Sequence, residues 1–269
     1  RIKFIMAYTT INKSTDHFDI RTYAASGAGS ISDVSFQPDF IWFKNRVSIG
    51  DHGLFDAIRG VTKYLQSNNN STGLTGNGSN DFTAFTSNGF TYGTSAQLDT
   101  STGTPCTWLW KANGTGSSNT DGSITSTVSA NTTSGFSIVK YTGTGSNATV
   151  GHGLGVAPKM IFIKSLGINE YWLIGGTNIS SNWSSSLHLN TTDSIDTFNY
   201  WQNYAPTTNS FYMTGDAALN QNTQDYIAYC FSDVQGFSKM GSYTGNGNAD
   251  GPFIYTGFKP SFILRKYAT

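Results

Sequence analysis

Charged residues are scarce in this chain. They make up 12% of the 269 residues, and the 16 basic and 16 acidic side chains give a formal charge of zero. A globular domain usually has about 25%. Because nucleic acid is bound through clustered lysine and arginine, this composition gives no reason to expect a nucleic-acid partner.

Cysteine and long apolar runs are scarce as well. The two cysteines, Cys106 and Cys230, are too few for a dense disulfide framework. We predict that both are buried thiols rather than ligands or nucleophiles. No apolar stretch approaches the ~18 residues that a membrane-spanning helix needs, so no membrane span is expected.

Glycine, hydroxyl and amide residues take the place of charge. Aromatic residues reach 14%, and there are 30 glycines. Aromatic and β-branched residues favour strands, whereas glycine and asparagine favour tight turns. The composition therefore predicts an all-β fold.

One phrase occurs three times, at 23–44, 141–164 and 243–266. Each copy opens with a tyrosine, has a proline before an apolar run and closes with a lysine. These residues are Tyr23, Pro38 and Lys44; Tyr141, Pro158 and Lys164; and Tyr243, Pro260 and Lys266. Self-similarity over such distances indicates a chain built from repeated units.

The repeat predicts the organisation of the chain. Two tandem antiparallel β-sandwich units, jelly-roll or lectin-like, are expected at 18–112 and 135–235. An N-terminal segment, 1–17, precedes them, and the Ser/Thr/Asn/Gly-rich stretch 113–134 is interpreted as an insertion or linker. Residues 236–269 are a partial third repeat of terminal strands that completes the second unit or a neighbouring chain.

One stretch of the first unit carries a conflicting signal. Within 52–68, apolar residues have helical spacing: Leu54, Ile58, Val61 and Leu65. The corresponding part of the second unit has Gly175 and Gly176, which are poor helix formers. We therefore predict a strand, a turn at Arg59-Gly60 and a second strand.

The third copy stops before it has the strands that would pair with it. A lone hairpin cannot bury its apolar face, so "FIYTGFKPSFIL" (253–264) must lie against the second unit or against another chain. Strand addition to a neighbouring subunit predicts a homo-oligomer. The residues predicted to carry assembly are Phe253, Ile254, Tyr255, Phe258, Phe262 and Ile263.

Residues for catalysis or metal binding are few. The one cluster is His52 with Asp51 and Asp56, and the second unit has no histidine at the equivalent place. A solvated loop is the better interpretation. "GNGNADG" (245–251) and "NTDG" (119–122) have the composition of calcium loops but lack the spaced terminal carboxylate, which favours turns. We predict no catalytic residue, metal or cofactor.

Aromatic residues in polar loops suggest a different function. Trp183 in "SSNWSSS", with Tyr200 and Trp201 in "FNYWQNY", could stack on the rings of a host-surface glycan. The alternative is that these side chains pack beneath long loops, as satellite clusters do.

Five long phrases carry a resemblance to a known family. They are "MAYTTINKSTDHF" (6–18), "HGLFDAIRG" (52–60), "TDGSITSTVSANTTSGFSIVKYTGTG" (120–145), "VGHGLGVAPKM" (150–160) and "FSKMGSYTGNGNADGPFIYTGFKPSFIL" (237–264). With these phrases the chain resembles a repeated domain family in virion proteins of marine tailed bacteriophages. The resemblance implies a structural or tail-associated protein without catalytic residues, in contact with other virion proteins. It implies assembly in the bacterial cytoplasm and a final place in the extracellular particle.

Overall fold

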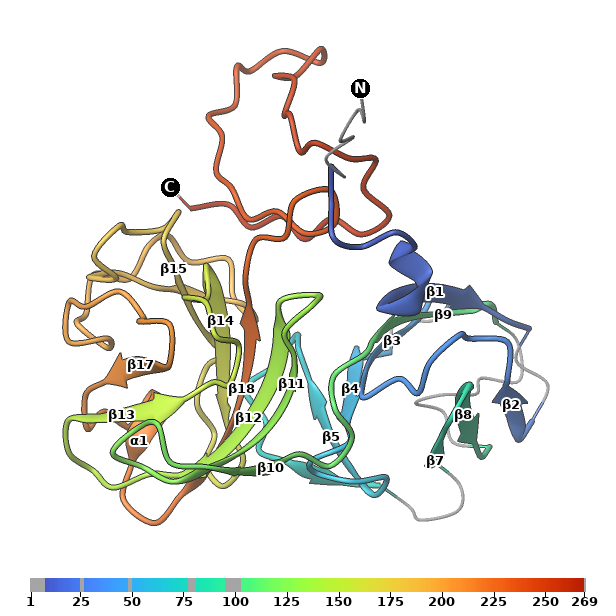
Figure 1. The fold of residues 1–269 in the computed structure, drawn as a ribbon, viewed down its shortest axis with the longest axis horizontal. Coiled ribbons are helices and arrows are strands. Elements are labelled where there is room, and N and C mark those ends of the chain that lie inside the picture. Colours follow the sequence, from blue (N-terminus) through green and yellow to red (C-terminus); the bar gives the residue numbers. More distant parts are fainter. Residues whose placement is uncertain (1–7, 25–26, 48–49, 77–80, 95–102, 269) are drawn as a thin grey trace, which may run out of the picture.

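A computed structural model describes residues 8–24, 27–47, 50–76, 81–94 and 103–268. Strands dominate these residues, and the described helical elements are a 3-10 turn, η1 (Ser14–Asp16), and one short helix, α1 (Ala217–Asn220). The all-β prediction is confirmed. The figures show strands arranged as stacked sheets, with a long segment without strands above them (Figure 1).

Two large antiparallel sheets form the centre of the molecule. The first has the order β1 (Phe18–Thr22), β9 (Pro105–Trp110), β3 (Phe40–Asn45), β4 (Gly53–Asp56), β5 (Lys63–Gln66) and β6 (Leu74–Thr75). The second has the order β10 (Ser117–Asn119), β11 (Ser126–Asn131), β12 (Phe136–Thr142), β18 (Asp225–Phe231), β14 (Met160–Ser165), β15 (Leu173–Gly176) and β16 (Leu187–His188).

A small sheet covers the outer face of each large one. The first is β2 (Gly29–Ile31), β8 (Gly89–Tyr92) and β7 (Phe82–Thr86), and the second is β13 (Ala148–Gly151) with β17 (Ser210–Met213). Each large sheet with its small sheet is a β-sandwich. The four layers therefore enclose three cores, of which the middle one lies between the two large sheets.

Strand periodicity explains how one strand serves two cores. Along β3, Phe40 and Trp42 enter the middle core, whereas Ile41 and Phe43 enter the outer core of the first sandwich. Successive side chains of a strand point to opposite faces, so a strand buried on both sides must be apolar throughout. The same holds for β18, where Tyr229 lies in the middle core and Cys230 in the outer one.

The two large sheets share one topology. The order β1-β9-β3-β4-β5 in the first matches β12-β18-β14-β15-β16 in the second. The register matches too, because Phe40 lies opposite Trp110 as Met160 lies opposite Phe231. Cys230 is buried and Cys106 is half-buried, and both are free thiols.

The stretch 113–134 is not a linker. Its β11 pairs with β12 over the whole strand, from Ser126 opposite Tyr141 to Asn131 opposite Phe136, and β10 pairs in turn with β11. The polar composition concealed these strands, because their hydroxyls bind backbone groups outside the large sheet: Ser126 Oγ donates to Gly151 O of β13, and Ser129 Oγ accepts from Asn113 N. The insertion extends the second large sheet.

Stretch 52–68 forms a strand, a turn and a strand, as predicted. β4 and β5 pair through Gly53 opposite Gln66, and Gly60 in the turn has a φ of +84°. A positive φ favours glycine. The helical spacing of the apolar residues is therefore a coincidence of two short strands and the turn between them.

The prediction of terminal strands at 236–269 is wrong for the described residues. Residues 236–268 contain no strand and pair with no sheet beyond an isolated bridge of Val234 with Ser238. We call residues 236–268 the terminal segment. It crosses above both sandwiches and lies beside the described start of the chain (Figure 1). Strands of the same phrase in the first two copies have sheet partners, whereas this copy has none among the described residues.

Candidate assembly surface

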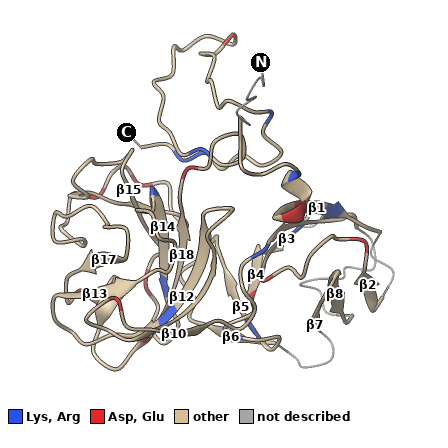
Figure 2. Ribbon diagram, viewed as in Figure 1, with Lys and Arg blue, Asp and Glu red and all other residues tan. Residues whose placement is uncertain are grey.

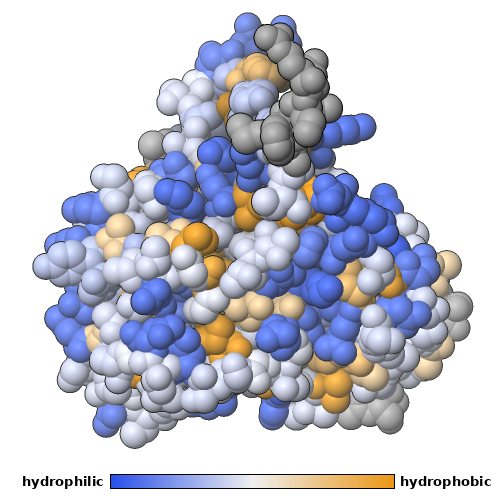
Figure 3. Space-filling view, in the orientation of Figure 1, coloured by the Kyte–Doolittle hydropathy of each residue, from blue (hydrophilic) through white to orange (hydrophobic). Residues whose placement is uncertain are grey.

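The terminal segment exposes apolar side chains to a degree not seen elsewhere among the described residues. Phe253 is 89% exposed and Tyr255 is 74% exposed. The other exposed large apolar side chains of the segment are Tyr243, Ile254, Ile263, Leu264 and Tyr267. Apolar groups form part of the surface of the projecting lobe (Figure 3). Contiguous exposed apolar surface of this kind is typical of interaction sites.

One aromatic side chain anchors the segment to the body. The Phe262 ring lies among four rings of the first large sheet, with its centroid 5.3 Å from that of Trp110 and 5.7 Å from that of Trp108. Phe18 and Trp42 complete this socket at 6.1 and 6.2 Å. Trp42 belongs to the middle core, and Trp108 and Trp110 pack against it, so the Phe262 ring lies at the rim of that core.

Hydrogen bonds fix the segment at two further places. The Tyr8 hydroxyl donates to Gly257 O at 3.1 Å. Near the other end, Lys266 Nζ donates to Thr191 O, and Ile195 N donates to Ala268 O at 3.3 Å. The loop 241–257 connects the second sandwich to these anchors. It projects away from the sheets (Figure 1).

The tip of that loop is a compact turn. Asn246 Oδ1 accepts from Asn248 N at 3.0 Å, and Asn248 Oδ1 accepts from Asp250 N at 3.1 Å. Asn246 Nδ2 donates to Asp250 O, and Gly247 has a φ of +68°. The side-chain oxygens that could have served calcium thus bind backbone N–H groups, as they do in turns.

The six residues predicted for assembly fall into three groups. Phe253, Ile254, Tyr255 and Ile263 are exposed, Phe258 is half-buried, and Phe262 points into the socket. The structure therefore gives Phe262 the role of an anchor. The exposed group is what remains available to another molecule.

The interpretation of Trp183 and Trp201 as glycan-stacking residues is wrong. Both are 0% exposed, and their rings pack edge to face at 5.1 Å in the outer core of the second sandwich. Trp201 Nε1 donates to Ser186 Oγ at 2.8 Å. Gly175 makes room for them, because a Cβ there would lie 2.5 Å from both indoles. A buried indole cannot stack on a sugar.

Tyr200, the third predicted glycan residue, is half-buried. Its hydroxyl donates to Asp196 Oδ2 at 2.9 Å, and burial together with this carboxylate raises the pKa of the phenol. Asp196 Oδ2 also lies 3.4 Å from His188 Nε2, and the His188 ring stacks on Tyr171 at 4.7 Å. Tyr171 and Phe198 are the exposed aromatics of this corner, and sequence reasoning chose their neighbours instead because local composition does not show which loop aromatics are buried.

The cluster of Asp51, His52 and Asp56 does not converge. Trp42 Nε1 donates to His52 Nδ1 at 2.9 Å, and burial lowers the pKa of that histidine. Asp51 accepts from Gln66 Nε2, whereas Asp56 is buried with Arg59 and Tyr229. Among the described residues, no group of three His, Cys, Asp or Glu side chains is placed to hold a metal ion.

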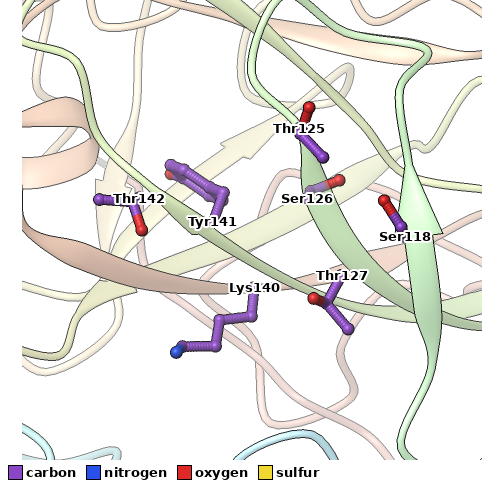
Figure 4. A pocket seen from close by; sticks show the side chains of 7 residues that line it. All are labelled: Ser118, Thr125, Ser126, Thr127, Lys140, Tyr141 and Thr142. Carbon is purple, nitrogen blue, oxygen red and sulfur yellow. The ribbon is translucent and has the colours of Figure 1, made fainter.

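A shallow hollow of about 180 Å³ lies over the edge of the second large sheet (Figure 4). Its lining is mostly hydroxyl: Ser118, Thr125, Ser126, Thr127, Lys140, Tyr141 and Thr142. The cation of this set is engaged, since Lys140 Nζ lies 2.9 Å from Asp225 Oδ2. The hollow brings together no nucleophile with a base.

The charges of the described residues are scattered over the ribbon, with no basic face in view (Figure 2). No helix among those residues is long and apolar enough to cross a membrane. The terminal segment is therefore the surface with the most distinctive chemistry.

Comparison with known families places the whole of this architecture in one domain. A family model described as a domain of unknown function, DUF7483, matches residues 13–269. The chain belongs to the DUF7483 family. The DUF7483 match includes the terminal segment with both sandwiches, so that segment is part of the family domain rather than an appendage to it. No curated protein and no solved structure matches the chain.

Proposed function

We propose that this DUF7483 chain is a non-enzymatic structural component of a bacteriophage particle. It acts as a head decoration, head fibre or tail appendage, through self-assembly and through contacts with other capsid or tail proteins. The resemblance of its repeated phrases to phage virion proteins supports this setting. The protein is assembled in the bacterial cytoplasm and ends in the extracellular particle.

The observation that carries the proposal is the exposed terminal segment. Phe253, Ile254 and Tyr255 are consecutive exposed residues on a loop held away from the sheets. Fully burying one such side chain contributes roughly 1.5–3 kcal/mol. Burial of these three side chains would therefore stabilise association, and the low charge of the chain adds little repulsion between copies.

Oligomeric mass tests the assembly part of the proposal. Light scattering of the chain at rising concentration is expected to show an oligomer, and Phe253→Ser with Tyr255→Ser is expected to give a folded monomer. The matched control is Val156→Ser, which changes an exposed apolar residue of the second unit and is expected to leave the oligomer intact. A wild-type chain that stays monomeric throughout would contradict self-assembly.

Composition of purified particles tests the setting. Mass spectrometry of particles from a phage encoding this chain is expected to find it at a stoichiometry set by the particle symmetry. Finding it in the infected-cell lysate but absent from the particles would overturn the virion assignment.

A second candidate function is recognition of a host-surface glycan. The exposed Tyr171 ring stacks on His188, which lies beside Asp196, and the exposed Phe198 ring packs on Tyr200, whose hydroxyl binds the same carboxylate. Aromatic rings and a carboxylate thus lie close together. Phe198→Ala with Tyr171→Ala is expected to abolish binding on a glycan array, with Val156→Ala as control. A double variant that binds glycan as well as the wild type does, or a wild-type chain that binds no glycan, would remove this candidate.

A further inference from the structure

The edges of the large sheets are poor acceptors for an added strand. On β1, the one long edge strand of the first sheet, Asp19 and Arg21 form an ion pair. The other edges are short: β6 and β16 have two residues each, and β10 has three. Charge and brevity are the usual devices by which proteins prevent edge pairing. The large sheets therefore offer the exposed loop no favourable edge for pairing.

The loop carries one stretch that is complementary to itself. Residues 251–258, "GPFIYTGF", hold no charge, so two copies can approach without repulsion. Phe, Ile and Tyr have high strand propensity. The backbone N–H and C=O groups of Phe253, Ile254 and Tyr255 make no hydrogen bond to any other described residue. They are free to form a ladder.

We propose that residues 252–256 pair antiparallel with the same residues of a second copy across a two-fold axis at Ile254. The inference rests on the self-assembly proposed above and specifies its partner. An antiparallel pair about a two-fold axis is self-complementary, since the same patch serves both subunits. Phe253 of each copy then lies opposite Tyr255 of the other, and the four rings gather on one face of the ribbon.

The ends of the stretch suit a pair of this length. Pro252 lies at its start, where a missing N–H costs no ladder bond. Gly257, with a φ of +83°, ends it and accepts the Tyr8 hydroxyl. Phe262 in its socket keeps each loop attached to its own body. The pairing therefore joins two folded chains without exchange of their sheets.

Cysteine cross-linking tests the register. In a Cys106→Ser background, Ile254→Cys is expected to give a disulfide-linked dimer under mild oxidation. Residues directly opposite in an antiparallel pair have Cα atoms about 4.5–5.5 Å apart, within the range that a disulfide spans. Ile263→Cys is the control: this position is 76% exposed against 47% for Ile254, lies on the same segment outside the pair, and is expected to stay uncross-linked.

Charge exchange supplies an independent test. Phe253→Lys alone and Tyr255→Asp alone are each expected to weaken the dimer at least tenfold in Kd. The double variant is expected to recover association, because each new lysine then lies opposite the partner's new carboxylate, and added salt should weaken it. No recovery in the double variant would overturn this register.

The outcomes separate this inference from the proposed function. An oligomer that cross-links through Ile263→Cys but not Ile254→Cys would overturn the self-pairing and leave assembly standing. A monomer at all concentrations, with no cross-link from either variant, would overturn both.

Discussion

At the scale of single residues, Gly175 decides where two of the most prominent aromatics lie. The sequence shows Trp183 and Trp201 in polar loops, and their surroundings in the chain favour exposure. In the structure these loops instead pack over β15, where the missing Cβ of Gly175 leaves space for both indoles. Contacts between a glycine on a strand and side chains many residues away cannot be inferred from local composition. The prediction failed for that reason.

Gly175→Ala tests this packing. Its Cβ would meet Trp183 and Trp201 at 2.5 Å, and overpacking of this kind costs about 1–3 kcal/mol of unfolding free energy. Urea unfolding measures it. Gly241→Ala, with nothing within 4 Å of its Cβ, is the control. Equal midpoints for the two variants would show that the indoles lie elsewhere.

Lys164 should make stability depend on pH. It is buried, and desolvation lowers its pKa to about 8. The unfolded chain, with the ordinary value of 10.5, binds more protons between these two values, so stability rises as pH increases through that window.

We expect the unfolding free energy of wild type, relative to Lys164→Met, to increase by ~1–3 kcal/mol from pH 7.5 to 9.5. Taking the difference cancels the opposing effect of Cys230, whose pKa burial raises to about 12. Parallel pH profiles would mean that Lys164 is charged and well solvated. Val156→Met, at an exposed site, gives the baseline.

At the scale of elements, the repeat was a better guide than local pattern. The repeat correctly predicted that 52–68 forms β4, a turn and β5, despite the helical spacing of its apolar residues. It misled at 236–268, because a strand needs a partner as well as a suitable sequence, and the described residues supply none. The repeat gave no indication of β11, whose serine and threonine residues are typical of a linker, although its backbone pairs with β12 and its Ser126 hydroxyl binds Gly151 O of the small sheet.

One buried group joins elements of the two large sheets. Tyr229 of β18 donates to Asp56 Oδ2 at 2.7 Å, and Arg59 Nη2 donates to the Tyr229 hydroxyl at 3.1 Å. Removing one member of a buried ionic group costs about 3–5 kcal/mol, so Asp56→Ala should destabilise strongly in thermal or urea unfolding. Asp225→Ala, which breaks the exposed pair with Lys140, should cost under about 1 kcal/mol. Similar losses in both would contradict the bridging role.

At the scale of the whole molecule, the two sandwiches are fused rather than strung together. Phe40, Trp42 and Leu54 of the first sheet share the middle core with Phe162 and Tyr229 of the second. The sequence predicted an all-β sandwich fold but not the contact between the two large sheets, because a strand that is apolar on both faces does not say what covers each face. We therefore expect calorimetry to show one cooperative transition.

Residues 1–112 alone are then expected to aggregate or remain unfolded, since the face that carries Trp42 and Leu54 would be exposed to water. Circular dichroism and light scattering of that fragment check this. Two separate transitions in the full chain, or a folded monomeric fragment, would show that the sandwiches are independent.

The socket around Phe262 also links the order of synthesis to the competence of the product. During synthesis Phe18, Trp42, Trp108 and Trp110 are all made before Phe262, the ring that they hold. The Phe262 anchor of the projecting loop forms only when the first sheet is already in place. A chain with a misfolded first half therefore lacks this anchor, and under the self-assembly proposed above such a copy would be a poor partner for its neighbours.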